Sequence, residues 1–476
     1  MRPTQFSVSE LLDATHGELL RGQTSSGVTG ISTDTRTLTA GEAYVALRGP
    51  RFDGHQFLRE ACARGAAALL VEQATNGHLS ELNGTPLIGV ADTVQAYGAL
   101  ARWHRRRFRL PVIAITGSCG KTTTKEYVRV LLEAHGSILT NHKTENNAIG
   151  VPRTLLQLTS QHTAAVVELG SNHPGEIAIL RDMVEPTHAI VTTIGPAHLA
   201  FFQSVAAVAA EKLSLLDAMP SSGGIVLNAD DPWMRQWAER HHVLGGLRLT
   251  TFGMGPHADV WASALQCTHE GMRFLVQGRH AAHVPTWGTH HVLDALAAIA
   301  CAEQLGSAVE TLLPRLAHCP LLELRMERRQ LPGGPTLLCD CYNANPLSMA
   351  QAIQALAQYP AGRRRILIAG EMRELGSFAT EAHCHVGQWA MQAQLDGVIA
   401  IGPYAALVLA GAQTVVKRSA LLMAYQTVEE ASQRVPELLR AEDVILIKGS
   451  RGAQLERLIA SCQARWHDHA VLAESV

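Results

Sequence analysis

The sequence predicts an α/β protein with three domains in a row, and three observations support this. At ~150 residues per domain, a chain of 476 residues corresponds to about three domains. Hydrophobic residues make up 47% of the chain and charged residues 17%, which supplies several buried cores. Continuous apolar runs alternate with amphipathic stretches, as in parallel strands that helices cover on both faces. We place the domains at residues 1–108, 109–320 and 321–476.

The sequence pattern of residues 1–108 predicts a small α/β unit. Apolar periodicity predicts helices at Val8–Leu20, Gln56–Arg64 and Thr93–Arg107. Strand-like runs lie between these helices, at residues 42–47, 68–72 and 86–90.

The apolar runs of the other two domains predict doubly wound, Rossmann-like sheets. Buried strands are expected in the second domain at 111–117, 164–170, 188–195 and 224–231. The third domain has such runs at 336–342, 365–371, 397–402 and 444–449, with a helix that starts near Pro346. Ligands bind outside the carboxyl ends of the strands in open α/β sheets, so residues that follow these strands are the functional candidates.

Charge and composition exclude several classes of protein. A net charge of -2 argues against a nucleic-acid binder, which would need a basic domain or stripe. The chain lacks an apolar run of the ~18 residues that a membrane span needs. Glu10, Asp13 and Glu18 interrupt the start of the chain, so no signal peptide is expected and the protein is predicted to be cytoplasmic. The nine cysteines predict reduced thiols, with Cys339 and Cys341 as strand residues rather than zinc ligands.

Residues 114–124 predict a phosphate-binding loop, because their sequence AITGSCGKTTT lies between a buried strand and a helix. Backbone N–H groups in such a loop wrap phosphate oxygens, the lysine reaches the β- and γ-phosphates, and the following hydroxyl can bind Mg²⁺. Ile115 stands where the usual motif has its first glycine. The loop predicts ATP binding by Gly117, Ser118, Cys119, Gly120, Lys121, Thr122 and Thr123, with Cys119 contributing only its backbone N–H. By itself it allows a kinase, an ATPase or a ligase.

Lysine is scarce in this chain. Only six of the 40 basic residues are lysines: Lys121, Lys125, Lys143, Lys212, Lys417 and Lys448. A lysine that survives in an arginine-rich chain suggests a position that needs a compact, reactive amine, although chance survival explains any single one equally well.

Other polar residues follow the strands of the second domain, and each has a structural alternative. Glu168 can hold Mg²⁺ or simply begin the next helix with a negative charge. A lone histidine such as His198 is more often structural than a ligand. Lys212 fits a solvated helix surface, and Asn146 and Asn147 fit a helix cap.

In combination, these segments resemble the Mur ligase family. The motifs that occur in the order of that family are T-G-S-C-G-K-T-T-T, N-N-x-x-G-V-P, E-L-G-S-N-H-P-G-E-I, I-G-P-A-H-L, N-A-D-D, Y-N-A-N-P-x-S-M, G-E-M-R-E-L-G and K-G-S-R-G. S-T-D-T-R at 32–36, A-L-R-G-P-R-F-D-G-H at 46–55 and A-R-G-A-A-A at 63–68 are similar to the family's UDP-binding domain. The resemblance covers nearly the whole chain.

The resemblance implies an ATP-dependent amide ligase of cytoplasmic peptidoglycan synthesis. The terminal carboxylate of UDP-N-acetylmuramoyl-tripeptide would attack the γ-phosphorus, and the amine of D-alanyl-D-alanine would then displace phosphate from the acyl phosphate. Residues 1–108 would bind the UDP substrate, 109–320 ATP, and 321–476 the acceptor and part of the nucleotide. Such ligases are usually monomers, so a monomer is expected, and charge and hydropathy predict neither a nucleic-acid partner nor membrane insertion.

The resemblance also assigns roles to single residues. Lys121, Glu168, His198 and Lys212 would be catalytic, with Thr122 and Glu168 on one Mg²⁺ and His198 and a carbamylated Lys212 on a second. The UDP substrate would meet Ser32, Arg36, Asn146 and Asn147, and the nucleotide would meet His291, Arg325 and Asp340. The acceptor would meet Asn343, Asn345, Lys448, Ser450 and Arg451. For the last three, helix capping and interdomain contacts are equally good explanations.

The chain departs from the family pattern at five places. Thr193 replaces a common asparagine, Ala200 a glutamate, and Leu324 a frequent glycine. His291 and Asp294 stand where adenine-side asparagines are usual, which makes the nucleotide geometry less certain.

Three alternatives are weighed against this function. A folylpolyglutamate-synthase-like enzyme would share the loop but would lack the first 108 residues. A Mur-like paralogue could join a different acid and amine, and a catalytically silent binding protein could keep the fold. Retention of Lys121, Thr122, Glu168, His198 and Lys212 together argues against the silent protein. The third residue of the tripeptide, diaminopimelate or lysine, is not readable from the sequence.

Overall fold

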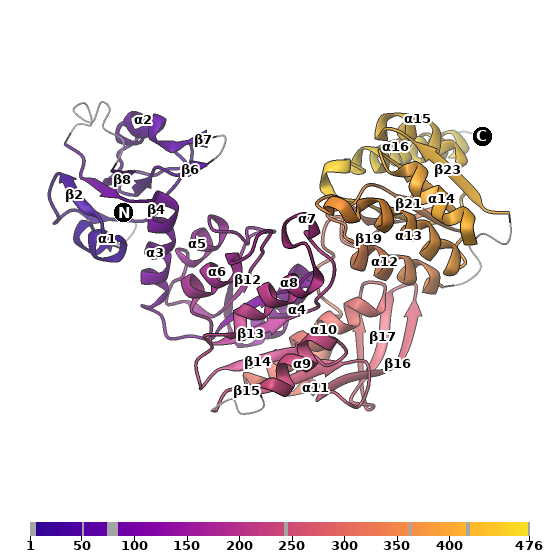
Figure 1. Ribbon diagram of the computed structural model, residues 1–476, viewed down its shortest axis with the longest axis horizontal. Helices are drawn as coiled ribbons and strands as arrows, with labels where there is room; N and C mark the ends of the chain where they lie inside the picture. Colours follow the sequence, from indigo (N-terminus) through magenta and orange to yellow (C-terminus); the bar gives the residue numbers. More distant parts are fainter. Residues whose placement is uncertain are drawn as a thin grey trace. The chain divides into compact units, whose positions relative to one another are not determined.

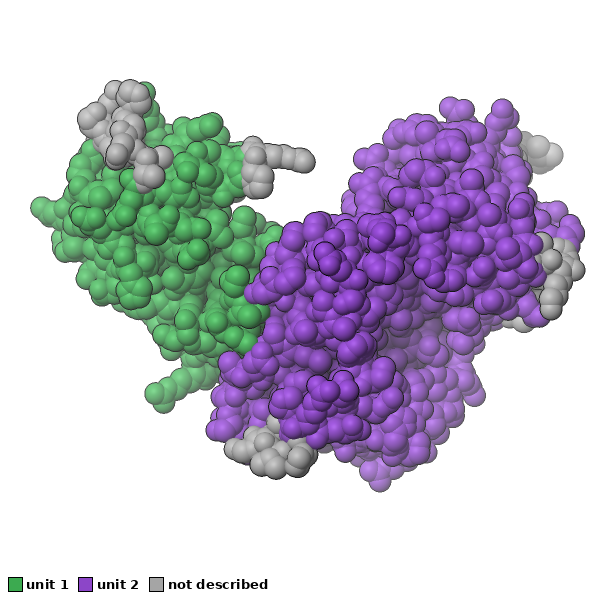
Figure 2. All heavy atoms as spheres, viewed as in Figure 1, with its two compact units in different colours: residues 1–114, 135–170, 178–186 green, residues 115–134, 171–177, 187–476 purple. Residues whose placement is uncertain are grey.

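The computed structural model describes residues 6–49, 52–73, 84–241, 246–360, 364–415 and 419–474, with side chains as far as residue 467. The chain is α/β throughout, as predicted (Figure 1). It divides into two compact units, residues 1–114, 135–170 and 178–186, and residues 115–134, 171–177 and 187–476 (Figure 2). None of the described helices has the length and apolar character to cross a membrane.

The first unit contains a five-stranded sheet of order β2-β9-β8-β5-β4. These strands are β2 (Glu18–Arg21), β9 (Leu87–Val90), β8 (Ala68–Glu72), β5 (Ala43–Val45) and β4 (Ile31–Ser32). The helices are α1 (Val8–Thr15), α2 (Leu58–Ala63), α3 (Thr93–Arg105), α5 (Gly150–Leu155) and most of α6 (Glu176–Val184). Short pairs join β1 (Phe6–Ser7) to β3 (Gly27–Val28) and β6 (Arg48–Gly49) to β7 (Phe52–Asp53), and β11 (Ser137–Thr140) runs parallel to β12 (His162–Glu168).

The helix predicted at Val8–Leu20 is wrong in its second half. The helix ends at Thr15, and the next residue, His16, has a left-handed backbone with φ of 52°. At Gly17 a Cβ would lie 2.7 Å from the Ile88 side chain, so the glycine lets the chain turn closely. The apolar residues that follow belong to β2, which pairs antiparallel with β9.

The second unit contains most of a nine-stranded sheet, ordered β11-β12-β10-β13-β14-β15-β16-β17-β18 along its full width. The strands not yet named are β10 (Val112–Thr116), β13 (His188–Val191), β14 (Gly224–Asn228), β15 (Arg248–Gly253), β16 (Val260–Thr268), β17 (Gly271–Val276) and β18 (His280–Val284). The helices are α4 (Lys121–Leu132), α7 (Leu199–Phe202), α8 (Val205–Leu213), α9 (Pro232–Arg240), α10 (Thr289–Gln304) and α11 (Val309–Leu316). The predicted parallel strands are confirmed, whereas β11, β15 and the antiparallel strands β16 to β18 were not predicted.

A six-stranded sheet of order β19-β20-β24-β21-β22-β23 completes the second unit. Its strands are β19 (Glu327–Gln330), β20 (Thr336–Asp340), β24 (Val444–Lys448), β21 (Arg365–Ala369), β22 (Gly397–Ile401) and β23 (Leu421–Tyr425). One core lies beneath α12 (Pro346–Gln358), α13 (Ala379–Gln392) and α14 (Ala405–Val415), and a second beneath α15 (Val428–Leu438) and α16 (Glu456–Glu474). Helices therefore cover both faces, as the continuous apolar runs of the third domain predicted.

Candidate functional site

The predicted phosphate loop joins the end of β10 to the start of α4. Gly117 and Gly120 have φ angles of 147° and 83°, which L side chains rarely adopt. A Cβ on Gly117 would lie 2.1 Å from Thr192 Oγ1, and one on Gly120 would lie 2.1 Å from Asp294 Oδ1. Both conformation and space therefore require glycine at these two positions, in a loop that leads into the N-terminus of α4, and helix N-termini are suited to binding anions.

Hydrogen bonds hold this loop in shape. Lys121 Nζ donates to the Gly117 carbonyl at 2.7 Å, so the cation lies over the loop. The Ser118 amide donates to the Thr193 carbonyl at 2.7 Å, and Ser118 Oγ donates to the Gly195 carbonyl at 2.9 Å. Because Thr193 contributes its backbone, replacing the usual asparagine leaves this contact intact.

Asn345 connects the loop to the start of α12. Its side chain accepts from the Ser348 amide at 2.8 Å, which caps the helix, and its Nδ2 donates to the Ser118 carbonyl at 3.4 Å. Cys119 Sγ lies 3.4 Å from Asn345 Oδ1, so the thiol makes a contact beyond the backbone role predicted for Cys119. Burial raises the pKa of this thiol.

A small pocket opens beside the loop and contains residues predicted to meet the nucleotide. Both ring nitrogens of His291 are buried without a hydrogen-bond partner, and burial lowers the pKa of this imidazole. Asp294 Oδ2 lies 3.7 Å from His291 Nδ1, and burial raises the pKa of the carboxyl well above its usual range. Thr124 Oγ1 donates to Asp294 Oδ1 at 3.3 Å. The pocket is lined by Thr123, Glu126, Tyr127, Pro285, Thr286, His291, Cys319, Pro320, Leu322 and Arg325.

The turn before Arg325 explains the glycine that is frequent there in the family. Leu324 is buried and has φ of 56°, a left-handed backbone that costs a leucine energy and a glycine none. The Arg325 guanidinium lies 4.3 Å from the centre of the Tyr342 ring, a cation–π contact that fixes its direction.

Asp340 and Lys448, predicted for different ligands, form one ion pair. They are register partners at the carboxyl ends of β20 and β24, and Lys448 Nζ lies 2.6 Å from Asp340 Oδ2. The ammonium also donates to the Asn343 carbonyl at 3.2 Å. Asn343 Oδ1 accepts from the neighbouring Ala344 amide at 2.9 Å, which is a local turn contact.

Ser450 and Arg451 follow β24. The Ser450 amide donates to the Glu371 carbonyl, and Ser450 Oγ accepts from the Arg373 amide, both at 2.9 Å. Arg451 is exposed and lies 3.6 Å from Glu456. Ser450 is thus fixed within the fold, whereas the Arg451 side chain is open to solvent.

Lys212 is not the solvated helix lysine that its sequence context suggests. Its side chain is 2% exposed, and Nζ donates to Ser171 Oγ at 2.6 Å. Burial, with a smaller effect of the Lys121 charge, lowers the pKa of Lys212 to about 7. A neutral amine is therefore accessible near neutral pH, which is the form that reacts with CO₂.

His198 precedes α7 in a left-handed conformation with φ of 53°. Its Nδ1 makes a hydrogen bond to the Glu374 carboxylate, and the Ala200 amide donates to the Glu374 carbonyl at 3.0 Å. Burial lowers the pKa of His198, although Glu374 acts in the opposite direction. Glu374 lies in the motif G-E-M-R-E-L-G, and no site role was predicted for it.

Glu168 ends β12 in the first unit and is 1% exposed. Asn146 Nδ2 donates to Glu168 Oε1 at 2.7 Å, and the Glu168 backbone is bound by Asn141, a residue that the analysis missed. Asn147 Oδ1 accepts from the amides of Ile149 and Gly150 at 3.1 and 2.9 Å. Asn146 thus orients a carboxylate, and Asn147 binds the backbone of the turn that leads into α5.

Ser32 ends β4, and Arg36 lies in the turn that follows this strand. Ser32 Oγ donates to the Asp34 carbonyl at 3.1 Å, and Arg36 forms a salt bridge with Asp34 at 2.7 Å. The Arg36 side chain is 84% exposed, and its charge lowers the pKa of Asp34. This arrangement leaves a cation available to a ligand.

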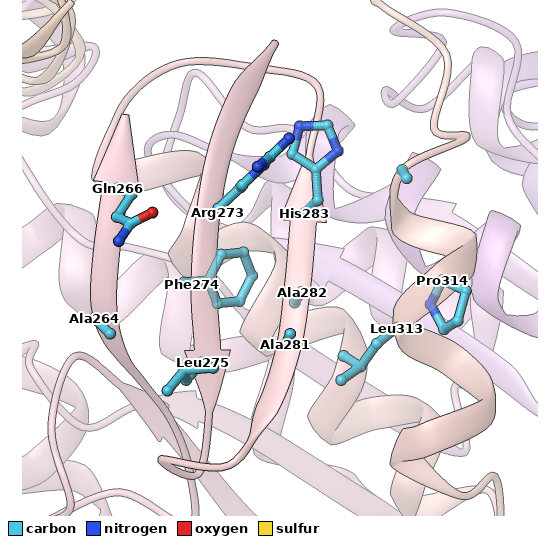
Figure 3. A pocket seen from close by; sticks show the side chains of 11 residues that line it. Ala264, Gln266, Arg273, Phe274, Leu275, Ala281, Ala282, His283, Leu313 and Pro314 are labelled. Carbon is cyan, nitrogen blue, oxygen red and sulfur yellow. The ribbon is translucent and has the colours of Figure 1, made fainter. Parts of the chain in front are cut away.

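A second pocket, of about 530 Å³, lies between strands β16 to β18 and α11 (Figure 3). Gln266, Arg273 and His283 are register partners on the three strands and form its polar part. Leu275 and Leu313 contribute to an apolar part. None of the residues predicted for the site lines it.

Three family models match successive parts of the chain. The model described as Mur ligase family, catalytic domain, matches residues 27–105, and the Mur ligase middle domain matches 115–302. The model described as Mur ligase, glutamate ligase domain, matches 324–451.

Curated relatives extend this similarity to almost the full length. UDP-N-acetylmuramoyl-tripeptide–D-alanyl-D-alanine ligase of Escherichia coli is 35% identical over 470 residues, which cover 96% of this chain and 98% of the relative. The ligase of the same name from Bacillus subtilis is 30% identical and covers 95% and 97%.

Solved structures agree. MurF from Acinetobacter baumannii superposes with a TM-score of 0.87 at 30% identity, covering 96% of this chain and 99% of that one. Folylpolyglutamate synthase from Mycobacterium tuberculosis shares the fold alone, with a TM-score of 0.60, 15% identity and coverage of 78% and 93%. With three successive domain matches and relatives of full length, the chain belongs to the Mur ligase family.

Proposed function

We propose that this protein is an ATP-dependent ligase of peptidoglycan synthesis that joins D-alanyl-D-alanine to the terminal carboxylate of UDP-N-acetylmuramoyl-tripeptide. The observation that carries the proposal is the glycine-dependent loop under Lys121, in a chain similar over its whole length to ligases of that name. Cytoplasmic location and a monomeric state stay predictions.

The chemistry brings two anions together. The carboxylate oxygen forms a bond to the γ-phosphorus while the bond to ADP breaks, which gives an acyl phosphate. The dipeptide amine then attacks the acyl carbon, loses a proton and expels phosphate. Lys121 and the amides of the loop offset the negative charge that builds up on the phosphoryl oxygens.

We infer from their donor types that Thr122, Glu168 and His198 suit the two magnesium ions that the family resemblance implies. Thr122 and Glu168 offer a hydroxyl and a carboxylate, which are oxygen donors suited to Mg²⁺, and His198 offers an imidazole nitrogen. Bound Mg²⁺ would neutralise phosphate charge and hold the phosphoryl oxygens.

We propose that Lys212 acts as a carbamate. The neutral amine attacks CO₂, a N–C bond forms and one proton leaves, so a buried base becomes an anionic oxygen ligand. Its 2% exposure and its lowered pKa support the proposal, because burial favours the neutral amine and a charged lysine would be costly there.

Residues 1–108 are proposed to hold the uridine nucleotide and 321–476 the acceptor. His291 and Arg325, which line the small pocket, are proposed to meet the adenine, since imidazole nitrogens without hydrogen-bond partners can bond a base. The substitution of two asparagines by His291 and Asp294 leaves a Mur-like paralogue with other substrates as the second candidate.

The decisive experiment replaces Lys121 by alanine. Because the loop depends on this cation at the phosphates, we expect turnover to fall by at least about 100-fold with the melting temperature unchanged. ADP release should require both substrates, tested with the diaminopimelate and the lysine tripeptide. Near-normal ADP release by a folded Lys121→Ala protein would reject this loop as the ATP site, and release with other acids or amines only would favour the paralogue.

A further inference from the structure

The motif G-E-M-R-E-L-G follows β21, and the proposed function leaves it without a role. Its residues contact two parts of the candidate site. On one side, the Glu371 carbonyl and the Arg373 amide bind Ser450 of the proposed acceptor segment, each at 2.9 Å. Arg373 also donates to the Gly452 carbonyl at 3.2 Å.

On the other side, Glu374 binds His198 and the start of α7. Its carboxylate forms a hydrogen bond with His198 Nδ1, and its carbonyl accepts a hydrogen bond from the Ala200 amide at 3.0 Å. Glu374 itself has φ of 62°, and a Cβ on the nearby Gly376 would lie only 3.2 Å from Ala200 Cα. Two hydrogen bonds and close backbone packing thus fix the carboxylate against this one imidazole.

We propose that Glu374 is a positioning residue that keeps the proton of His198 on Nδ1 and leaves Nε2 free to bind a metal ion. A carboxylate can only accept, so the imidazole nitrogen that meets it must carry the proton. In a neutral imidazole the other nitrogen then has the lone pair, and carboxylates orient metal-binding histidines in this way in many proteins. The proposal rests on the role of His198 in the proposed function.

Segment 371–374 connects the proposed metal ligand His198 to the proposed acceptor segment. The segment 371–374 ends with Glu374, the residue that binds His198. The same segment also binds Ser450, through the Glu371 carbonyl and the Arg373 amide. Displacement of the acceptor segment would therefore disturb the metal ligand, and metal binding would favour the segment's position.

The first test measures the tautomer directly, without metal or substrates. Full-length protein with ¹⁵N-labelled histidine is studied by NMR at pH 8, and the His198 signals are identified by their loss in His198→Gln. We expect the proton on Nδ1 in the wild type and in Glu381→Ala, an exposed-glutamate control, and a mixture of tautomers in Glu374→Ala. Glu374→Gln keeps an acceptor oxygen and should shift the mixture less. The same spectrum in wild type and Glu374→Ala would overturn the proposal.

The second test asks whether Glu374 acts through His198. In the wild-type background Glu374→Ala should lower kcat by about 10- to 100-fold, with Glu374→Gln in between. In a His198→Gln background the same change should cost almost nothing more. Equal losses in both backgrounds would overturn the proposal. Failure of the proposed function would appear differently, as a wild type that releases no ADP with the two substrates.

Discussion

Lys212 and Lys448 are equally buried, each 2% exposed, but their surroundings differ. Lys448 meets the Asp340 carboxylate at 2.6 Å, whereas the closest hydrogen-bond partner of Lys212 is the Ser171 hydroxyl at 2.6 Å. Among the described residues, no carboxylate lies within salt-bridge distance of Lys212. Burial alone drives an amine toward its neutral form, and a carboxylate partner offsets that effect. We therefore expect different roles for the two lysines, a reactive amine at Lys212 and a structural ion pair at Lys448.

The largest expected effect concerns activity at Lys212. Arginine cannot form the proposed carbamate and would place a fixed charge beside the proposed metal ion, so Lys212→Arg and Lys212→Ala should both lose most activity. Steady-state assays of ADP release measure this.

Two further assays test the carbamate itself. Short carboxylates should partly restore Lys212→Ala by supplying the missing oxygens, and removal of CO₂ should lower wild-type activity. A Lys212→Arg enzyme as active as wild type would show that the carbamate idea is wrong.

At Lys448 the effect should be on stability. Lys448→Ala leaves the Asp340 carboxylate in a partly buried site without its cation, which should lower the free energy of unfolding by about 3–5 kcal/mol. Urea unfolding measures it, and replacing both partners by apolar residues should cost less than the two single changes combined. If Lys448→Ala lowers the free energy of unfolding by less than the replacement of an exposed lysine does, the ion pair does not stabilise the sheet.

The pH dependence of stability separates the two lysines further. The pKa of Lys212 is about 7 in the fold and 10.5 ordinarily, so between these values the unfolded chain binds more protons. Wild-type stability in CO₂-free buffer should therefore rise with pH across this window, and the lowered pKa should cost up to about 5 kcal/mol below pH 7. The free energy of unfolding of Lys212→Met lacks this dependence on pH. The stability of this variant relative to wild type should therefore decrease between pH 6 and pH 9. Parallel pH profiles would contradict the neutral-amine assignment.

The smallest structural effect is expected at Arg36, an exposed cation paired with Asp34. Arg36→Ala should leave urea unfolding unchanged, because exposed ion pairs contribute little. If residues 1–108 bind the uridine nucleotide, the KM for the UDP substrate should rise and that for ATP should stay constant. An equal rise of both would indicate a structural role only.

Contiguous patterns in the sequence predicted the α/β class, most of the parallel strands of the last two sheets and the phosphate loop, whereas the parallel strands β11, β15 and β23 were not predicted. The loop was predictable because its glycines, its lysine and the strand and helix around it are consecutive. The antiparallel strands β16 to β18 were not predicted, since their half-exposed faces lack the continuous apolar runs that mark buried parallel strands.

Only the tertiary structure decided which polar residues meet. Glu374 and His198 are 176 residues apart, and Asp340 and Lys448 are 108 apart, so no local periodicity relates them. Scarcity marked Lys212 together with five other lysines and the family resemblance gave it a role, but its burial, its Ser171 partner and its lowered pKa come from packing. Charge state follows from desolvation and from the neighbours that folding brings close, and neither is encoded in adjacent residues.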